Sequence, residues 1–273
     1  MASKLICVYA VMDAVMCRGI NLSQDQMADQ AVHRDSLVLI PGTLCDARIF
    51  KRQVVALRRR WQVIVLDYSR LRGLDDWPQQ VLRSLPERFF LAGFSLGGLW
   101  ALELLRRAPL RLKGLAMIAS NAEAGSRLGQ RRGADLWRLW RRAGPDSVVG
   151  KVKPDYFHYR PIRTRNSRLM RDMARSTDAR AARSEFDWAA HRPNGLGLLA
   201  KFDEPLLIVS GAQDRLCPRN LQQRMAEAQP KAKWVELLRC GHFVPLEKPV
   251  ALTNALSHWL SQNRITHQAG SFS

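Results

Sequence analysis

Short apolar runs alternate with amphipathic stretches along most of this chain. The first run, Leu37–Ile40, ends at Pro41 and Gly42 and predicts a buried strand followed by a turn. Comparable runs predict strands at residues 37–40, 63–66, 88–94, 112–119, 205–210 and 234–238. Helical spacing predicts helices at residues 49–60, 74–85, 99–107, 220–229 and 250–261. Because the strands have no polar face and alternate with helices, we expect an α/β fold with a mostly parallel sheet covered on both sides.

One long segment interrupts this alternation. Between the fourth and fifth predicted strands, residues 121–200 contain no predicted strand and are arginine-rich, helical in pattern and broken by four prolines. We therefore expect a core formed by 36–120 and 201–262, with 121–200 as a helical cap. Residues 1–35 are expected to form a poorly defined N-terminal extension, and 263–273 a flexible tail.

The amino-terminal stretch partly matches a signal peptide. Lys4 precedes an apolar run at residues 5–12, but Asp13 interrupts the run and no small-x-small cleavage site follows. Met27 lies close before the first predicted strand, so we interpret the first two dozen residues as an extension upstream of a more natural start. No apolar run in the sequence approaches the ~20 residues that a membrane span needs.

Composition narrows the class of protein. Of the 273 residues, 47% are hydrophobic and 25% charged, which excludes a disordered or collagen-like chain. The 43 Lys and Arg outnumber the 24 Asp and Glu, and the formal net charge is +19. Such a charge attracts nucleic acid or acidic proteins. No basic block interleaved with aromatic residues is present, so we predict a solvated basic surface and no nucleic-acid partner.

The odd number of cysteines, with no C-x-x-C pair, favours a reducing, cytoplasmic location.

A candidate nucleophile lies directly after the third predicted strand. The segment Gly93-Phe94-Ser95-Leu96-Gly97 fits G-x-S-x-G and stands between a strand and a helix. A serine nucleophile projects from a very tight turn, so its neighbours must be small. The helix that follows directs free N–H groups and a positive dipole end at the site. This context distinguishes the motif from an ordinary glycine-rich turn.

His242 is the candidate base, because a serine hydroxyl is a poor nucleophile until a base accepts its proton. It follows the last predicted strand and so lies, like Ser95, at the carboxyl edge of the sheet. His158 is a candidate pocket residue, although surface packing fits its context as well. The other histidines are interpreted as surface residues: His33, His191, His258 and His267.

Asp214 is the candidate acid that orients the base. It follows the predicted strand at 205–210, so it too lies at the carboxyl edge of the sheet. Asp67 and Asp187 are competitors, but Asp67 precedes the nucleophile in the chain. The order Ser95, Asp214, His242 is the order of α/β-hydrolases.

Four motifs in this order resemble the α/β-hydrolase superfamily. They are Pro41-Gly42-Thr43-Leu44, the Ser95 elbow, the Asp214 loop and the His242 loop. The resemblance covers 36–262 and is to small, carboxylesterase-like serine esterases with a cap, including acyl-carrier-protein methyl ester esterases. Haloalkane dehalogenases and epoxide hydrolases of this fold carry an aspartate nucleophile, so Ser95 argues against both.

The resemblance implies further features of the site. Backbone N–H groups of Thr43 and Leu96 would form the oxyanion hole, with Leu44 as a fallback donor. Many relatives have His-Gly where this chain has Pro41-Gly42. The family often opens with two strands that residues 1–35 do not clearly show, so the sheet would have about six strands rather than eight. No metal and no cofactor are expected.

The cap is the candidate substrate-binding region. Residues 121–200 contain 17 basic and eight acidic residues, a net charge of +9. Two aromatic residues three positions apart fall on one helix face. The candidate pocket residues are Leu44, Phe94, Trp137, Trp140, Phe157 and Phe243. The resemblance suggests an acidic acyl carrier protein as a partner for the basic cap; plain solvation of the arginines is the alternative.

These features predict a serine hydrolase that cleaves a small-molecule carboxylic ester, or a thioester, through an acyl-enzyme intermediate. The same triad also serves C–C bond hydrolysis, lactone opening and cofactor-free perhydrolysis. A non-catalytic receptor that keeps the fold is a further alternative. The sequence does not distinguish these functions, because they depend on the shape and chemistry of the substrate pocket.

Overall fold

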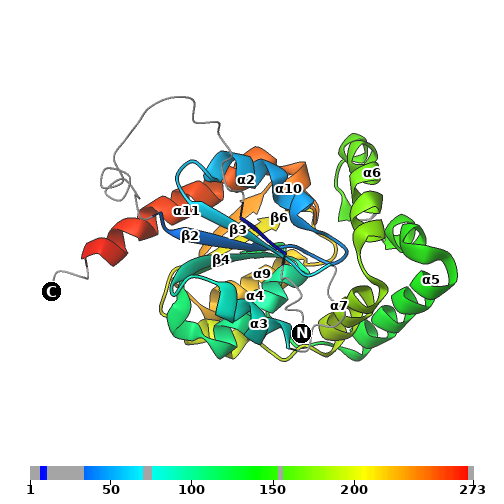
Figure 1. The fold of residues 1–273 in the computed structure, drawn as a ribbon, viewed down its shortest axis with the longest axis horizontal. Coiled ribbons are helices and arrows are strands. Elements are labelled where there is room, and N and C mark those ends of the chain that lie inside the picture. The colour runs from blue at the N-terminus through cyan, green and yellow to red at the C-terminus, as the bar shows by residue number, and fades with distance from the viewer. Residues whose placement is uncertain (1–6, 11–33, 70–75, 153–155, 270–273) are drawn as a thin grey trace, which may run out of the picture.

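A computed structural model describes residues 7–10, 34–69, 76–152 and 156–269. A seven-stranded sheet with the strand order β1-β3-β2-β4-β5-β6-β7 forms the centre of the fold (Figure 1). The strands are β1 (Cys7–Ala10), β2 (Ser36–Ile40), β3 (Gln62–Asp67), β4 (Phe89–Phe94), β5 (Leu112–Ile118), β6 (Leu206–Gly211) and β7 (Lys233–Leu237). Strands β2 to β7 pair in parallel, and all six were predicted from the apolar runs.

Strand β1 was not expected. It pairs antiparallel with β3, from Cys7 opposite Asp67 to Ala10 opposite Ile64. Its residues belong to the apolar run that partly matches a signal peptide. Such an isolated run does not show, from sequence alone, that it pairs with a strand elsewhere in the chain. The other observations on the amino-terminal stretch, on Lys4, Asp13 and Met27, lie outside the described residues.

Helices cover both faces of the sheet (Figure 1). Alternation along β2 divides the core: Leu37 and Leu39 pack with one apolar cluster, and Val38 and Ile40 with the other. The first face is covered by α2 (Lys51–Leu57) and α11 (Pro249–Ala269), and the second by α3 (Trp77–Ser84), α4 (Leu96–Arg107) and α9 (Arg219–Ala228). The connections also contain η1 (Ala47–Phe50), η2 (Pro109–Arg111) and α10 (Val244–Glu247).

The last helix is longer than expected. A flexible tail was expected from residue 263, but α11 continues to Ala269. Arg264 supplies a reason, because its guanidinium lies 3.3 Å from an Asp35 carboxylate oxygen and over the ring of Trp61. These contacts hold Arg264, the second residue of the expected tail, against the core.

Four helices lie between β5 and β6: α5 (Arg127–Val152), α6 (Arg160–Ser176), α7 (Ala179–His191) and α8 (Leu196–Ala200). Helix α5 bends at Gly144, whose φ is 74°, directly before Pro145. Figure 1 shows α5, α6 and α7 to one side of the layered core. Among the described residues, no helix is both long and apolar enough to cross a membrane.

Candidate active site

Ser95 occupies a strained turn between β4 and α4. Its φ of 54° and ψ of −117° lie in a region that side-chain-bearing residues rarely adopt. The Ser95 N–H donates to the Ile118 carbonyl at 2.9 Å, and the Ser95 carbonyl accepts from the Ser120 hydroxyl at 2.7 Å. Such strain costs about 1–3 kcal/mol and persists only where the surroundings hold it, as these bonds do here. The turn places the Ser95 hydroxyl within hydrogen-bond distance of His242.

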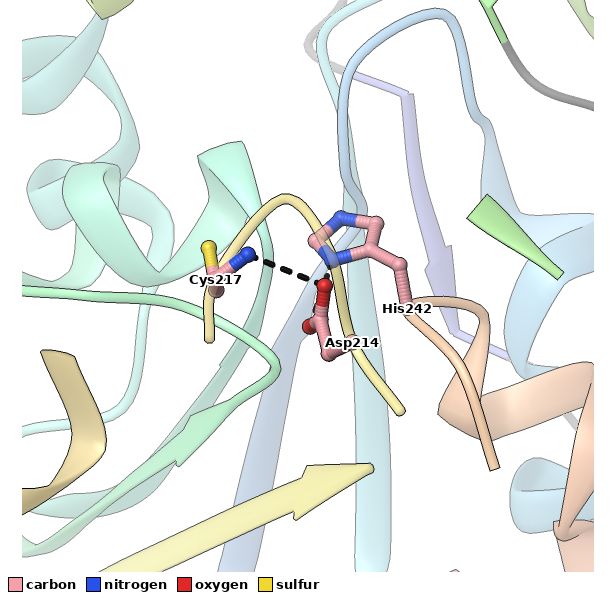
Figure 2. Close-up of side chains that lie close together, drawn as sticks. All are labelled: Asp214, Cys217 and His242. Atoms are coloured by element: carbon pink, nitrogen blue, oxygen red, sulfur yellow. Dashed lines mark hydrogen bonds and ion pairs between the residues drawn. The ribbon is translucent and has the colours of Figure 1, made fainter. Parts of the chain in front are cut away.

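The structure brings Ser95, His242 and Asp214 into one chain of hydrogen bonds. His242 Nε2 lies 2.8 Å from Ser95 Oγ, and His242 Nδ1 lies 2.8 Å from Asp214 Oδ2. Figure 2 shows the Asp214 carboxylate between the imidazole and the backbone of Cys217. The second carboxylate oxygen, Oδ1, accepts from the backbone N–H groups of Leu216 and Cys217 at 2.8 and 2.9 Å. This arrangement orients a general base toward a serine hydroxyl.

The loop that carries His242 is fastened to the segment before α6. The His242 N–H donates to the Tyr156 carbonyl at 2.7 Å. The Glu247 carboxylate accepts from the N–H of Gly241 at 3.0 Å and from the N–H of His158 at 2.9 Å. Burial raises the pKa of Glu247, and the backbone hydrogen bonds oppose that rise. Sequence reasoning did not identify Glu247 or Tyr156, although Glu247 stands five positions after the candidate base.

The loop after β2 lies against the elbow. A Cβ added at Gly42 would lie 2.9 Å from Phe94 Cδ1 and 3.1 Å from Ser95 Cβ, so a larger residue here would displace the Phe94 ring or the elbow. Thr43 lines the cavity at Ser95, and Leu96 is the first residue of α4. Leu44 is not available as the fallback donor, because its N–H donates to Glu185 Oε2 at 2.7 Å. Glu185, on α7, was not identified from the sequence.

A cavity of about 330 Å³ opens beside Ser95 and His242. Three of the candidate pocket residues line it: Leu44, Phe94 and Phe243. Further lining residues come from the segment 121–200 and are not among the six candidates: Arg132, Leu136, Val148, Tyr156, Phe186 and Arg192. The wall is mostly apolar and carries arginine side chains.

The other three candidate pocket residues do not line this cavity. Phe157 stacks on Phe243, with ring centroids 4.6 Å apart. Trp140 is buried in the apolar cluster, and Trp137 lies under the guanidinium of Arg183. The face of α5 that lines the cavity carries Gly129, Arg132, Gly133 and Leu136. Trp140 is four positions after Leu136 and so shares this helix face, but it lies one turn farther along α5 and packs in the apolar cluster instead of lining the cavity.

Comparison with known proteins identifies the family. Residues 37–256 match the alpha/beta hydrolase family. The chain belongs to this family. A pimeloyl-[acyl-carrier protein] methyl ester esterase of Pectobacterium atrosepticum is 26% identical over 241 residues, which cover 80% of this chain and 91% of that protein.

Solved structures agree on the fold. An esterase from Thermogutta terrifontis superposes with a TM-score of 0.74 at 24% identity, covering 84% of this chain and 90% of that one. An enol-lactonase from Burkholderia xenovorans also has a TM-score of 0.74, at 21% identity, covering 84% of this chain and 92% of that one. The predicted α/β-hydrolase fold and the carboxylesterase-like hydrolase class are confirmed.

Three neighbouring side chains, Asp214, Cys217 and His242, each offer an atom that could ligate a metal ion. Atoms of Asp214, Cys217 and His242 lie within 4.8 Å of one another. However, Asp214 and His242 are hydrogen-bonded to each other, and burial raises the pKa of the Cys217 thiol to about 12. Metal ligation requires the thiolate, which this pKa disfavours at neutral pH. The group therefore fits the serine–histidine–aspartate chain better than a metal centre.

Cys217 is expected to resist alkylation in the native hydrolase. With a pKa of about 12, only on the order of one thiol in 10⁴ is ionised near pH 8, and the side chain is buried as well. Iodoacetamide followed by peptide mass spectrometry measures the modification at this site. Full labelling is expected in guanidinium chloride, which serves as the control, and rapid labelling of the native protein would contradict the burial seen here.

Proposed function

We propose that the hydrolase cleaves a carboxylic ester through an acyl-enzyme formed on Ser95. The observation that carries the proposal is the hydrogen-bonded chain from Ser95 Oγ through His242 to Asp214, next to an apolar cavity. This order of groups serves nucleophilic catalysis at an acyl carbon.

In the proposed first half-reaction, Ser95 Oγ attacks the ester carbonyl carbon while His242 Nε2 accepts the hydroxyl proton. The carbonyl oxygen becomes an oxyanion, which the backbone N–H groups of Thr43 and Leu96 stabilise. His242 then gives its proton to the leaving alcohol. Asp214 holds the imidazole with Nδ1–H directed at its carboxylate and stabilises the imidazolium.

In the second half-reaction, water attacks the acyl carbon and transfers a proton to His242. Ser95 Oγ leaves and takes that proton back, which releases the acid. The burial of Asp214 and His242, both at most 5% exposed, keeps bulk water from competing for their hydrogen bond.

The substrate proposed is the methyl ester of an acyl chain carried by acyl carrier protein. The Pectobacterium relative bears that activity in its name, and the matched region spans most of both proteins. The 80 residues of the cap, 121–200, carry a net charge of +9, whereas the other 193 residues of the chain carry +10. The cap therefore has the higher density of positive charge, which supports an acidic carrier protein as partner. Exposed guanidinium groups on α5 and α6 supply this charge: Arg131, Arg141, Arg142, Arg160 and Arg165. The apolar cavity suits the acyl chain.

Methyl pimelate presented on acyl carrier protein is expected to be a better substrate than dimethyl pimelate. At low salt, kcat/KM for the carrier-bound ester should be at least about tenfold higher, and about 0.5 M NaCl should remove most of that advantage. Methanol release measures both reactions.

The double variant Arg141→Glu/Arg142→Glu provides the matched control. It should lose the advantage of the carrier-bound ester and hydrolyse dimethyl pimelate as the wild type does, because these side chains do not line the cavity. Equal kcat/KM for both esters at low salt would contradict a carrier-bound substrate. Failure to hydrolyse either ester would count against ester cleavage and favour the other reactions of the same triad.

A further inference from the structure

Two arginine side chains line the catalytic cavity, and no acidic side chain from the described part of the chain lines it. Arg132 belongs to α5, and Arg192 follows directly after α7. The rest of the wall is mostly apolar. Cavities of this kind orient their ligands through the few polar groups that they contain, so two cationic groups indicate a ligand that carries a negative charge.

Arg192 is a half-buried cation whose protein partners are neutral. Its guanidinium donates to the Glu123 carbonyl at 2.8 Å, to Asn121 Oδ1 at 3.1 Å and to the Ala189 carbonyl. Among the described residues it has no ion pair, and the Glu123 carboxylate pairs with Arg224. Burial lowers the pKa of Arg192, although a guanidinium remains protonated at neutral pH. A cation taken from water without a counter-ion is costly, and an anionic ligand in the cavity would supply that counter-ion.

Arg132 is held at the cavity by Tyr156. Its guanidinium donates to the Tyr156 hydroxyl at 2.6 Å and lies over the Tyr156 ring, 5.8 Å from the ring centroid. The same ring packs edge-on against the His242 imidazole, with centroids 5.5 Å apart. No carboxylate in the described part of the chain pairs with Arg132, and a guanidinium has five N–H donors. Arg132 can therefore bind an anion while it keeps its hydrogen bond to Tyr156.

We propose that Arg132 and Arg192 form a carboxylate subsite, and that the hydrolase also cleaves free half-esters of dicarboxylic acids. The proposal rests on the proposed function of Ser95 and extends it to substrates without a carrier. The ester carbonyl would lie at Ser95, and the carboxylate at the other end of the acyl chain would contact a guanidinium through both oxygens. The carboxylate belongs to the acyl chain, because the methanol portion of the ester is too small to carry it. Since neighbouring groups already hold both guanidinium groups, little side-chain freedom is lost on binding.

Monomethyl and dimethyl esters of the same diacid test the subsite, because they differ only by one methyl group and one charge. The series runs from succinate to suberate, since the chain length that fits reports the spacing between Ser95 and the subsite. For at least one chain length, kcat/KM for the monoester should exceed that for the diester by at least about tenfold. Methanol release measures both reactions.

Removing either charge should reduce this preference. Arg132→Met keeps an unbranched side chain, and the ratio of the two kcat/KM values should fall at least about fivefold. Arg132→Lys should retain part of the preference, because the charge remains but the planar two-pronged contact is lost. Arg192→Gln should lower the ratio in the same direction, with circular dichroism to check its fold.

Arg138→Met is the matched control, because Arg138 is an exposed residue of the same helix that does not line the cavity. It removes the same charge from α5 and should leave the ratio unchanged, which separates local binding from attraction by the net charge of the protein. A ratio near one at every chain length in the wild type would overturn the proposal. So would a preference that survives both Arg132→Met and Arg192→Gln, or one that Arg138→Met lowers equally.

Binding to Ser95→Ala gives a second readout that does not need turnover. By isothermal titration calorimetry, the Kd for the preferred monoester, or for monomethyl pimelate if no ester is hydrolysed, should be at least about tenfold lower than for its diester. The difference should disappear in Ser95→Ala/Arg132→Met. If the wild type hydrolyses no ester, the proposed function fails and the Kd values alone decide on the subsite. A charge-dependent Kd that is lost with Arg132 would then support it, and equal Kd values for the two esters would overturn it.

Discussion

Replacing Ser95 with alanine is expected to lower kcat/KM for ester hydrolysis by at least about 10⁴-fold while leaving the fold intact. The change removes the Oγ atom that lies 2.8 Å from His242 Nε2. Without it, the base has no nucleophile to activate, and only the oxyanion donors and substrate binding remain to accelerate attack by water. Hydrolysis of p-nitrophenyl butyrate measures the loss directly.

The fold should survive this change because the bonds that hold the elbow are made by backbone atoms. The Ser95 N–H and carbonyl partners, Ile118 and Ser120, are the same in the alanine variant. Circular dichroism and thermal unfolding should therefore match the wild type closely. Ser167→Ala, on α6 and away from the cavity, is the control and should keep full activity. Retention of activity in Ser95→Ala would show that another group performs the attack.

The core of this fold was predictable because buried parallel strands leave continuous apolar runs in the sequence. Leu37–Ile40 is such a run, and the structure extends it by one residue to Ser36. Strand β1 could not be predicted in this way, because its apolar run resembles the centre of a signal peptide. Its partner, β3, also begins more than fifty residues later in the chain. A short edge strand is specified by pairing, and pairing is not visible in local pattern.

The proximity of Ser95, Asp214 and His242 was predictable for a topological reason. Each follows a strand of one parallel sheet, and the carboxyl ends of such strands share an edge. Glu185 and Tyr156 could not be found this way. Their bonds to Leu44 and His242 connect the helical segment to the core, and they depend on how that segment packs rather than on any motif. The aromatic residues on α5 did not indicate the cavity, because Trp140 is buried in the apolar cluster and does not line the cavity.

Gly97→Ala is expected to destabilise the protein by roughly 3 kcal/mol or more and to abolish most activity. An added Cβ would lie 2.1 Å from the Ile40 carbonyl oxygen and 2.5 Å from that of Pro41. Both are backbone atoms at the end of β2, so neither can rotate away. Moving them would also displace the loop that contains Thr43 and Leu44. Urea unfolding and ester hydrolysis measure the two effects.

The sign of this result is what makes it informative. Glycine to alanine inside a helix normally stabilises by up to about 1 kcal/mol, because alanine has the better helix propensity. Gly150→Ala, at an exposed position of α5 where an added Cβ meets nothing within 4 Å, should show that ordinary gain. If alanine destabilises the protein at Gly97 and stabilises it at Gly150, then α4 packs directly against the end of β2, as the structure has it. Equal stabilisation at both would mean that the elbow and the loop after β2 are not in contact, and an oxyanion hole shared between Thr43 and Leu96 would then lose its geometric basis.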